Sequence, residues 1–118
     1  MSSDHHHRVD YLEIPTPDPA ASKAFCQRLF GWEFTDYGPD YTSFQDGRMA
    51  GGFHRAEQAA SLDAGSVLLV VYSTDLEGDM SRVIEAGGTI TKAIFSFPGG
   101  RRFHYRDPAG VEMALWSE

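Results

Sequence analysis

The chain has 118 residues, of which 42% are hydrophobic, and its 10 Lys and Arg against 17 Asp and Glu give a formal net charge of -7. This length suits one domain with one core, and this hydrophobic fraction excludes disordered and fibrous proteins. The acidic balance argues against nucleic acid as a partner, because nucleic-acid binders carry a basic surface.

The sequence also limits the compartment and the kind of cysteine chemistry. Cys26 is the only cysteine, which excludes an intrachain disulfide and a thiolate zinc site, and we expect its thiol to be buried and inert. The longest apolar run, residues 67–72, is far shorter than the roughly twenty residues that cross a bilayer. The start of the chain is polar and has no secretory signal. We therefore expect a cytoplasmic protein that does not bind membranes.

Three adjacent histidines, at positions 5–7, follow this polar start. Adjacent side chains in a tail seldom converge on one metal ion. We interpret residues 1–8 as a disordered tail, either a frayed terminus or the remnant of a tag, and residues 9–118 as the single domain.

The first half of the domain begins with alternating residues typical of a strand, at 9–14, which we expect to end at Pro15. Asp18 is placed to cap a helix that starts at Pro19, and Gly31 to end it. Turn residues then separate three predicted strands at 32–37, 41–46 and 49–54.

The second half follows an exposed linker at 55–65. It starts with a predicted strand at 67–73, and Asp75 caps a helix that ends at Gly87 and Gly88. The apolar face of that helix comprises Leu76, Met80, Val83 and Ile84. The last three predicted strands are 89–97, 101–106 and 111–116.

The two halves, about 9–54 and 67–116, align as an internal repeat. The matched pairs are Tyr11 with Leu68, Asp18 with Asp75, Gly31 with Gly88, Asp46 with Asp107, and Gly47 with Gly110. Such a repeat predicts two copies of one unit, each covering the apolar face of the other. The fold class is therefore α+β, with the order βαβββ twice.

This order resembles the vicinal oxygen chelate superfamily, which includes glyoxalase I, bleomycin-resistance proteins and extradiol dioxygenases. The resemblance covers about 9–116 and is strongest toward glyoxalase-related bacterial proteins. Its markers are the segments LEIP (12–15), KAF (23–25), LFGWEF (29–34), EAGG (85–88), FPGG (97–100), RF (102–103), DPAG (107–110) and LW (115–116). The resemblance implies a cup-shaped curved sheet with two helices outside, a small-molecule cleft and a homodimer.

In the metal-dependent members, ligands come from the first and last strands of each half. The corresponding positions here are Tyr11, Gly51, Leu68 and Ala114, and none is a histidine or a carboxylate. We therefore expect no metal site. A different site built from Glu13, His104 and Glu112 would need three strands to share a favourable register. The chain has no phosphate loop or dinucleotide motif, so we expect no cofactor.

Strand alternation identifies the side chains that share the side of Tyr11, which the resemblance assigns to the cleft. For Arg102 and His104, the register of their strand leaves the face open. The candidate ligand-binding residues are Tyr11, Tyr72, Arg102, Glu112 and Trp116, and the candidate catalytic residues are Glu13 and His104.

Each candidate has an alternative. Glu13 can pair with an arginine within the sheet, His104 can be an exposed strand residue, and Tyr11 and Tyr72 can be packing residues. Three functions remain open: a metal-free protein that binds a small molecule, an isomerase or lyase that uses side-chain acid–base groups, and an assembly or regulatory module with a vestigial cleft.

Overall fold

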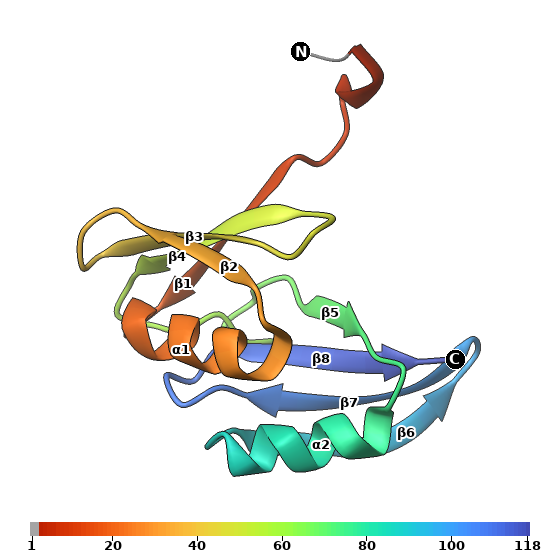
Figure 1. Cartoon of the computed structure of the whole chain (residues 1–118). Helices are drawn as coiled ribbons and strands as arrows, with labels where there is room; N and C mark the ends of the chain where they lie inside the picture. Colours follow the sequence, from red (N-terminus) through yellow and green to blue (C-terminus); the bar gives the residue numbers. More distant parts are fainter. Residues whose placement is uncertain (1–2) are drawn as a thin grey trace.

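A computed structural model describes residues 3–118 (Figure 1). A short 3-10 turn, Ser3–His5, lies in the segment that projects from the body of the molecule. The elements that follow are β1 (Tyr11–Thr16), α1 (Pro19–Phe30), β2 (Glu33–Asp36), β3 (Tyr41–Gln45), β4 (Ala50–Arg55), β5 (Leu69–Tyr72), α2 (Leu76–Glu85), β6 (Thr89–Phe97), β7 (Gly100–Arg106) and β8 (Glu112–Ser117). This order is the predicted βαβββ unit twice, so the α+β class is confirmed.

The start of each helix shows the repeat at the level of single hydrogen bonds. The Asp18 side chain accepts a hydrogen bond from the backbone N–H of Ala21, and the Asp75 side chain accepts one from Gly78. Before each cap, the hydroxyl of Thr16 or Ser73 accepts a hydrogen bond from the backbone N–H of the capping aspartate. The same local chemistry therefore starts both helices.

The helix ends match less closely than the sequence alignment predicts. Gly31 ends α1 in the left-handed conformation, with φ 71°. In the second half, Ala86 caps α2 and Gly87 has the positive φ, 94°. A side chain at Gly88 would instead collide with Val83, at 2.7 Å. Gly87, rather than Gly88, is thus the conformational counterpart of Gly31.

Strand β1 continues through Pro15 to Thr16, so the predicted end at Pro15 is wrong. The reason is that β1 is the edge strand of its sheet, where a missing N–H need not break a ladder. The Pro15 carbonyl still accepts a hydrogen bond from the N–H of Ala60 in the linker.

The strands form two four-stranded sheets. The first sheet has the order β1-β4-β3-β2, and the second has the order β5-β8-β7-β6. In each sheet the first strand runs parallel to the last strand of its unit, and the remaining pairs are antiparallel. Strands β1 and β5 are therefore both edge strands, and they belong to different sheets.

We call the helix-covered side of each sheet its inner face and the opposite side its outer face. Inner-face residues of both halves form one continuous core, which includes Ile14, Phe25, Phe53, Val83, Phe103, Tyr105 and Leu115. Leu76 and Val83 anchor α2 in this core as predicted. Ile84, however, is 54% exposed, so its predicted place on the buried face is wrong.

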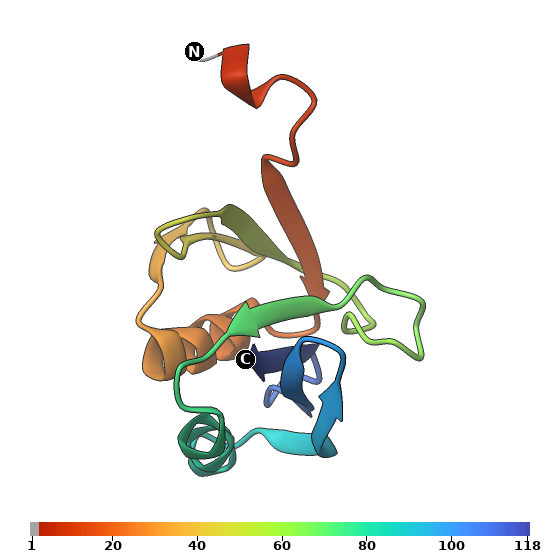
Figure 2. The ribbon, with the colours of Figure 1, turned by 90° about the vertical axis from the view of Figure 1, so that its right-hand side faces the viewer.

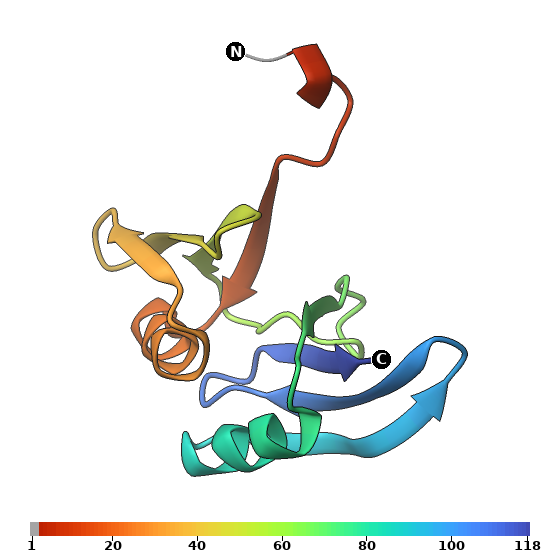
Figure 3. The same ribbon diagram turned by 45° about the vertical axis from the view of Figure 1, so that its right-hand side comes forward.

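Helix α1 connects the two halves. It lies between the first sheet and the second half, as Figures 2 and 3 show together with Figure 1. The Ser22 hydroxyl donates a hydrogen bond to Asp107 at 2.7 Å, and the rings of Phe25 and Tyr105 lie 5.8 Å apart. Both inner faces turn toward this shared core, and both outer faces point away from it.

Neither helix within residues 3–118 is long and apolar enough to cross a membrane.

Candidate functional site

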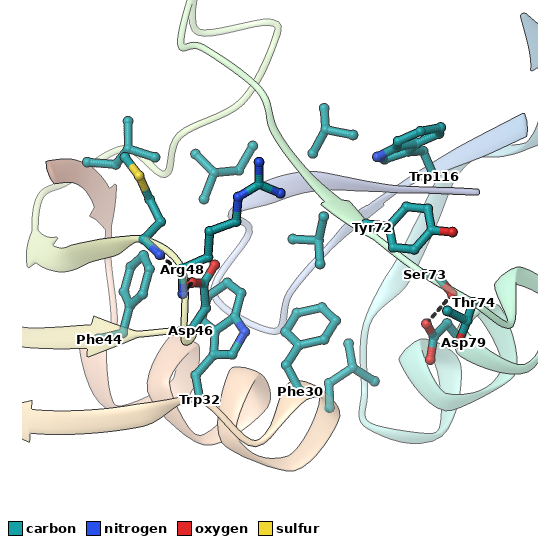
Figure 4. A pocket seen from close by; sticks show the side chains of 16 residues that line it. Phe30, Trp32, Phe44, Asp46, Arg48, Tyr72, Ser73, Thr74, Asp79 and Trp116 are labelled. Atoms are coloured by element: carbon teal, nitrogen blue, oxygen red, sulfur yellow. Dashed lines mark hydrogen bonds between the residues drawn. The ribbon is translucent and has the colours of Figure 1, made fainter. Parts of the chain in front are cut away.

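A cavity of about 820 Å³ lies between the two halves, beside α1 and the edge strand β5 (Figure 4). We call it the inter-half cavity. Pockets that hold small organic molecules usually have volumes of roughly 300–1,000 Å³ and mostly apolar walls with a few polar groups. This cavity fits that description in both size and lining.

The wall from the first half is aromatic. The ring of Trp32 stacks on Phe30 at 5.0 Å and on Phe44 at 4.8 Å between centroids. Arg48, on the loop between β3 and β4, extends along the cavity in Figure 4. Asp46 shapes this loop, because its side chain accepts hydrogen bonds from the backbone N–H groups of Arg48 and Met49.

The wall from the second half is strand β5. The cavity meets the inner-face residues Leu69 and Val71 and the outer-face residues Val70 and Tyr72, so it extends around the free edge of this strand. On the outer face it reaches Trp116, whose ring lies edge-on to Tyr72 with centroids 5.1 Å apart. The inter-half cavity thus opens onto the outer face of the second sheet.

The outer face of the second sheet is ordered in rows that run from strand to strand. One row consists of Tyr72, Trp116, Arg102 and Phe95, and the next consists of Val70, Ala114, His104 and Lys92. Side chains directly opposite on neighbouring strands lie close enough to interact. The structure therefore places Arg102 and His104 on the face of Tyr72 and Trp116.

Cations and rings alternate on this face. The Lys92 ammonium lies 4.2 Å from the centroid of Phe95, and the Arg102 guanidinium lies 5.3 Å from Phe95 and 5.4 Å from Phe97. Within residues 3–118, neither Lys92 nor Arg102 forms an ion pair with a carboxylate. The positive charge here is held by aromatic faces rather than by acids.

His104 is 5% exposed, so the alternative of an exposed strand residue is wrong. Its Nε2 and the Nε of Arg102 are buried and have no hydrogen-bond partner among the described residues. Burial, and then the charge of Arg102, lower the pKa of His104 below its ordinary value. His104 thus takes up a proton less readily than an exposed histidine, and it lies beside an arginine that has no carboxylate partner within residues 3–118.

Glu112 shares this outer face, but its carboxylate is already engaged. One oxygen accepts a hydrogen bond from the backbone N–H of Leu62 and the other from the Thr91 hydroxyl. These contacts attach the linker and β6 to the start of β8, which is a structural role. They leave Glu112 poorly placed as a direct ligand contact.

The outer face of the first sheet carries a separate polar cluster. The hydroxyls of Tyr11 and Tyr41 lie 2.5 Å apart, and Tyr41 donates a hydrogen bond to Glu13 at 3.1 Å. A phenol has one proton to donate, so Tyr11 is the donor to Tyr41. Burial, with these hydrogen bonds, raises the pKa of Tyr41. Glu13 therefore pairs with a tyrosine and not, as the alternative held, with an arginine.

Gly52 makes room for this cluster. A Cβ at this position would lie 2.9 Å from the Tyr11 hydroxyl and closer still to that of Tyr41. The neighbouring Gly51 faces the core, where a Cβ would meet the ring of Phe44 and the carbonyl of Leu12. The sequence placed Gly51 on the cleft side, and this placement is wrong by one residue.

The corrected set of positions does not fit a metal centre. The resemblance assigns metal ligands to Tyr11, Leu68, Ala114 and, after this correction, Gly52, and of these only the tyrosine has a side-chain donor atom. No group of three or more His, Cys, Asp and Glu side chains in residues 3–118 is arranged to hold a metal. Zinc and related ions need several convergent donors.

The structure thus divides the predicted site residues between two outer faces. Tyr11 and Glu13 lie on the first sheet, whereas Tyr72, Arg102, His104, Glu112 and Trp116 lie on the second. Sequence reasoning missed Tyr41 and the aromatic wall of Phe30, Trp32 and Phe44. Gly52, a glycine within a strand that pairs with Glu13, was a signal for Tyr41.

Cys26 is not part of either region. Its side chain is 1% exposed in the shared core, and burial raises the pKa of its thiol. The predicted burial of this thiol is therefore confirmed, and its raised pKa supports the prediction that it is inert.

Comparison with known proteins begins with a family model described as the Glyoxalase/Bleomycin resistance protein/Dioxygenase superfamily, which matches residues 8–115. Among curated proteins, the anthracycline biosynthesis protein DnrV of Streptomyces peucetius is 30% identical over 124 residues. That match covers 90% of this chain but 45% of the relative. The chain therefore spans less than half the length of the curated relative.

Solved structures share the fold at low sequence identity. A glyoxalase/bleomycin resistance protein/dioxygenase family enzyme from Burkholderia phytofirmans superposes with a TM-score of 0.76 at 19% identity, covering 92% of this chain and 98% of that one. The fosfomycin resistance protein FosX of Listeria monocytogenes, crystallised with Mn(II) and 1S,2S-dihydroxypropylphosphonic acid, has a TM-score of 0.75 at 15% identity. The match covers 98% of this chain and 90% of FosX.

Proposed function

Because this chain belongs to the glyoxalase/bleomycin resistance protein/dioxygenase superfamily, we propose that it binds a small organic molecule in the inter-half cavity without a metal ion. The observation that carries this proposal is the cavity itself, of about 820 Å³, with an aromatic wall on one side and the free edge of β5 on the other. The cleft residues described above do not form a metal-binding group within residues 3–118, which supports binding by side chains alone.

The test is a thermal-shift screen of small organic molecules, because a ligand that binds only the folded state raises the melting temperature. Compounds that stabilise the wild type are then measured against V70W, which fills the cavity beside β5. The control is V67W, which adds the same bulk at an exposed position outside this cavity. Loss of binding in V70W alone supports the proposal, and equal binding in all three proteins contradicts it.

A second candidate function is acid–base catalysis, and the Tyr11–Tyr41–Glu13 chain favours it. A phenol hydrogen-bonded to a carboxylate can donate or take up a proton at a bound substrate. These residues lie on the outer face of the first sheet and do not line the inter-half cavity. The test therefore follows, by mass spectrometry, the conversion of those molecules from the screen whose binding V70W leaves unchanged. Conversion that Y41F and E13Q abolish, while the affinity is unchanged, would establish an enzyme. Binding without conversion in the wild type would leave the binding function.

We also propose that the chain forms a homodimer. Apolar side chains, including Val67, Val70 and Tyr72, are exposed along the free edge of β5. The outer face of the second sheet carries Lys92, and the outer face of the first carries Glu13. Two copies that set one face against the other would bring these opposite charges together.

Sedimentation velocity with K92E tests this assembly. The charge reversal should shift the protein toward the monomer, because it places two carboxylates in one interface. R28E makes the same change of charge on the exposed end of α1 and should leave the dimer intact. A wild type that sediments as a monomer at micromolar concentration would contradict the proposal.

A further inference from the structure

The outer face of the second sheet has more positive charge than its own acids neutralise, although the whole chain carries a net charge of -7. Arg106 has a carboxylate partner, Asp63, at 3.5 Å, and Glu112 is engaged with the linker. The remaining acid at this face, Glu118, accepts a hydrogen bond from the Tyr72 hydroxyl. Lys92 and Arg102 are left without an ion pair within residues 3–118.

Arg101 shows that the lack of an ion pair is a property of the outer face and not of strand β7. Arg101 and Arg102 are neighbours on β7 and point to opposite sides of the sheet. Arg101 donates two hydrogen bonds to Glu77, at 2.6 and 3.2 Å. Arg102 instead faces Trp116 across the strand pair and lies over the rings of Phe95 and Phe97.

Three buried nitrogen atoms on the outer side of β7, Arg102 Nε, His104 Nε2 and Arg106 Nε, lack hydrogen-bond partners among the described residues. Arg106 is otherwise paired with Asp63. The whole of His104 is 5% exposed. Buried polar groups in proteins are nearly always paired, and an orphan group usually marks a missing ligand or water. Arg102 and His104 lie on β7, the strand next to β8, whose Trp116 lines the inter-half cavity.

We propose that the molecule bound by this chain is an aromatic acid, whose rings pack against Tyr72 and Trp116 and whose carboxylate is held by Arg102. The inference rests on the proposed binding function and specifies its ligand class. The ring edges of Tyr72 and Trp116 border the cavity and supply the aromatic surface. Arg102 is the next side chain in the same row, and a guanidinium matches a carboxylate in shape and charge.

Three probes separate the two parts of this ligand: naphthalene-2-carboxylate, its neutral carboxamide, and cyclohexanecarboxylate. Isothermal titration should give the tightest binding for naphthalene-2-carboxylate. R102Q should weaken it by about tenfold or more, since hydrogen bonds to charged groups contribute about 1.5–3 kcal/mol. R101Q, one residue away on the other side of the sheet, should bind within about twofold of the wild type, because a lost exposed ion pair matters little.

R102K provides a second variant, which keeps the charge and loses the planar fork, and its affinity should lie between those of the wild type and R102Q. Equal binding of the carboxylate and the carboxamide, or equal affinities of R102Q and R101Q, would overturn the proposed carboxylate contact. Equal binding of cyclohexanecarboxylate would overturn the aromatic part. If none of the three probes binds while other molecules still bind in a V70W-sensitive way, the ligand class is wrong and the binding function stands. If no small molecule binds at all, both fail.

Discussion

Arg101 and Arg102 are adjacent in β7, yet within residues 3–118 only Arg101 of the two forms an ion pair, with Glu77 at 2.6 Å. The pleat of the strand turns Arg102 to the outer face, where it lies between aromatic rings. The two residues are thus an internal control for each other. Every effect that depends on the outer face should follow Arg102 and spare Arg101.

The titration of His104 is the first such effect. Burial lowers the pKa of His104, and the positive charge of Arg102 lowers it further. NMR titration of the His104 ring protons should therefore give a pKa below 6.5 in the wild type. R102Q should raise that pKa, because it removes the charge that lowers it most, and R101Q should not. A pKa above 6.5 in the ligand-free wild type would contradict the described burial.

The pH dependence of stability should identify Asp107. Burial raises the pKa of this carboxyl above 3.8, although hydrogen bonds from Ser22 and from backbone N–H groups oppose the rise. The unfolded chain therefore loses this proton at a lower pH than the folded chain. It follows that Asp107 costs stability as the pH rises from about 3.8 through its raised pKa.

Urea unfolding of the wild type and D107N from pH 4 to 7 measures this effect. The free energy of unfolding of the wild type, relative to that of D107N, should fall as the pH rises, by about 1.4 kcal/mol for each unit by which the pKa is raised. D46N makes the matching change in the exposed turn of the first half, where Asp46 also binds backbone N–H groups. A difference that stays flat or grows with pH would show that Asp107 is not destabilised by burial.

Gly52 should be intolerant of even one methyl group. In G52A the new Cβ would meet the hydroxyls of both Tyr11 and Tyr41. We expect a loss of about 1–3 kcal/mol in the free energy of unfolding, as for other overpacked positions. S43A, at the position paired with Gly52 on β3, is the control and should change stability much less. Equal stability of G52A and the wild type would mean that the two tyrosines move apart without cost.

Measuring the metal content tests whether the side chains of the two sheets bind a metal ion. A chain that begins at Arg8 lacks the three histidines that would bind nickel or zinc adventitiously. After mild chelation, this shortened protein should retain well under one equivalent of zinc, nickel, manganese or iron, because its strands offer too few convergent donors. About one equivalent retained would contradict the metal-free account and return attention to Lewis-acid chemistry.

Local signals were sufficient to predict much of this fold. Asp18 and Asp75 cap their helices as expected, and alternation correctly placed Ile14 in the core, with Leu12 on the same face of β1. The repeat followed from these caps, because the same hydrogen bonds recur at the same spacing. Such features depend on a few neighbouring residues, which is why a single sequence reveals them.

Features that depend on register were harder to predict. Gly51 and Gly52 differ by one residue, and a shift of one reverses the face of every side chain. On β6, two irregularities between Ile90 and Phe95 bring Lys92, Phe95 and Phe97 to one face, which simple alternation forbids. The inter-half cavity depends on how α1 packs against the second half, and no local pattern encodes that packing.

The most direct test of this account is to locate naphthalene-2-carboxylate on the protein by NMR. The chain has two tryptophans, Trp32 and Trp116, and both line the inter-half cavity. We predict that the probe shifts both indole N–H signals, together with the Arg102 Nε–H signal and the backbone signals of β5. Shifts confined to a different groove, such as the one beside Lys23 and Thr42, would contradict the account.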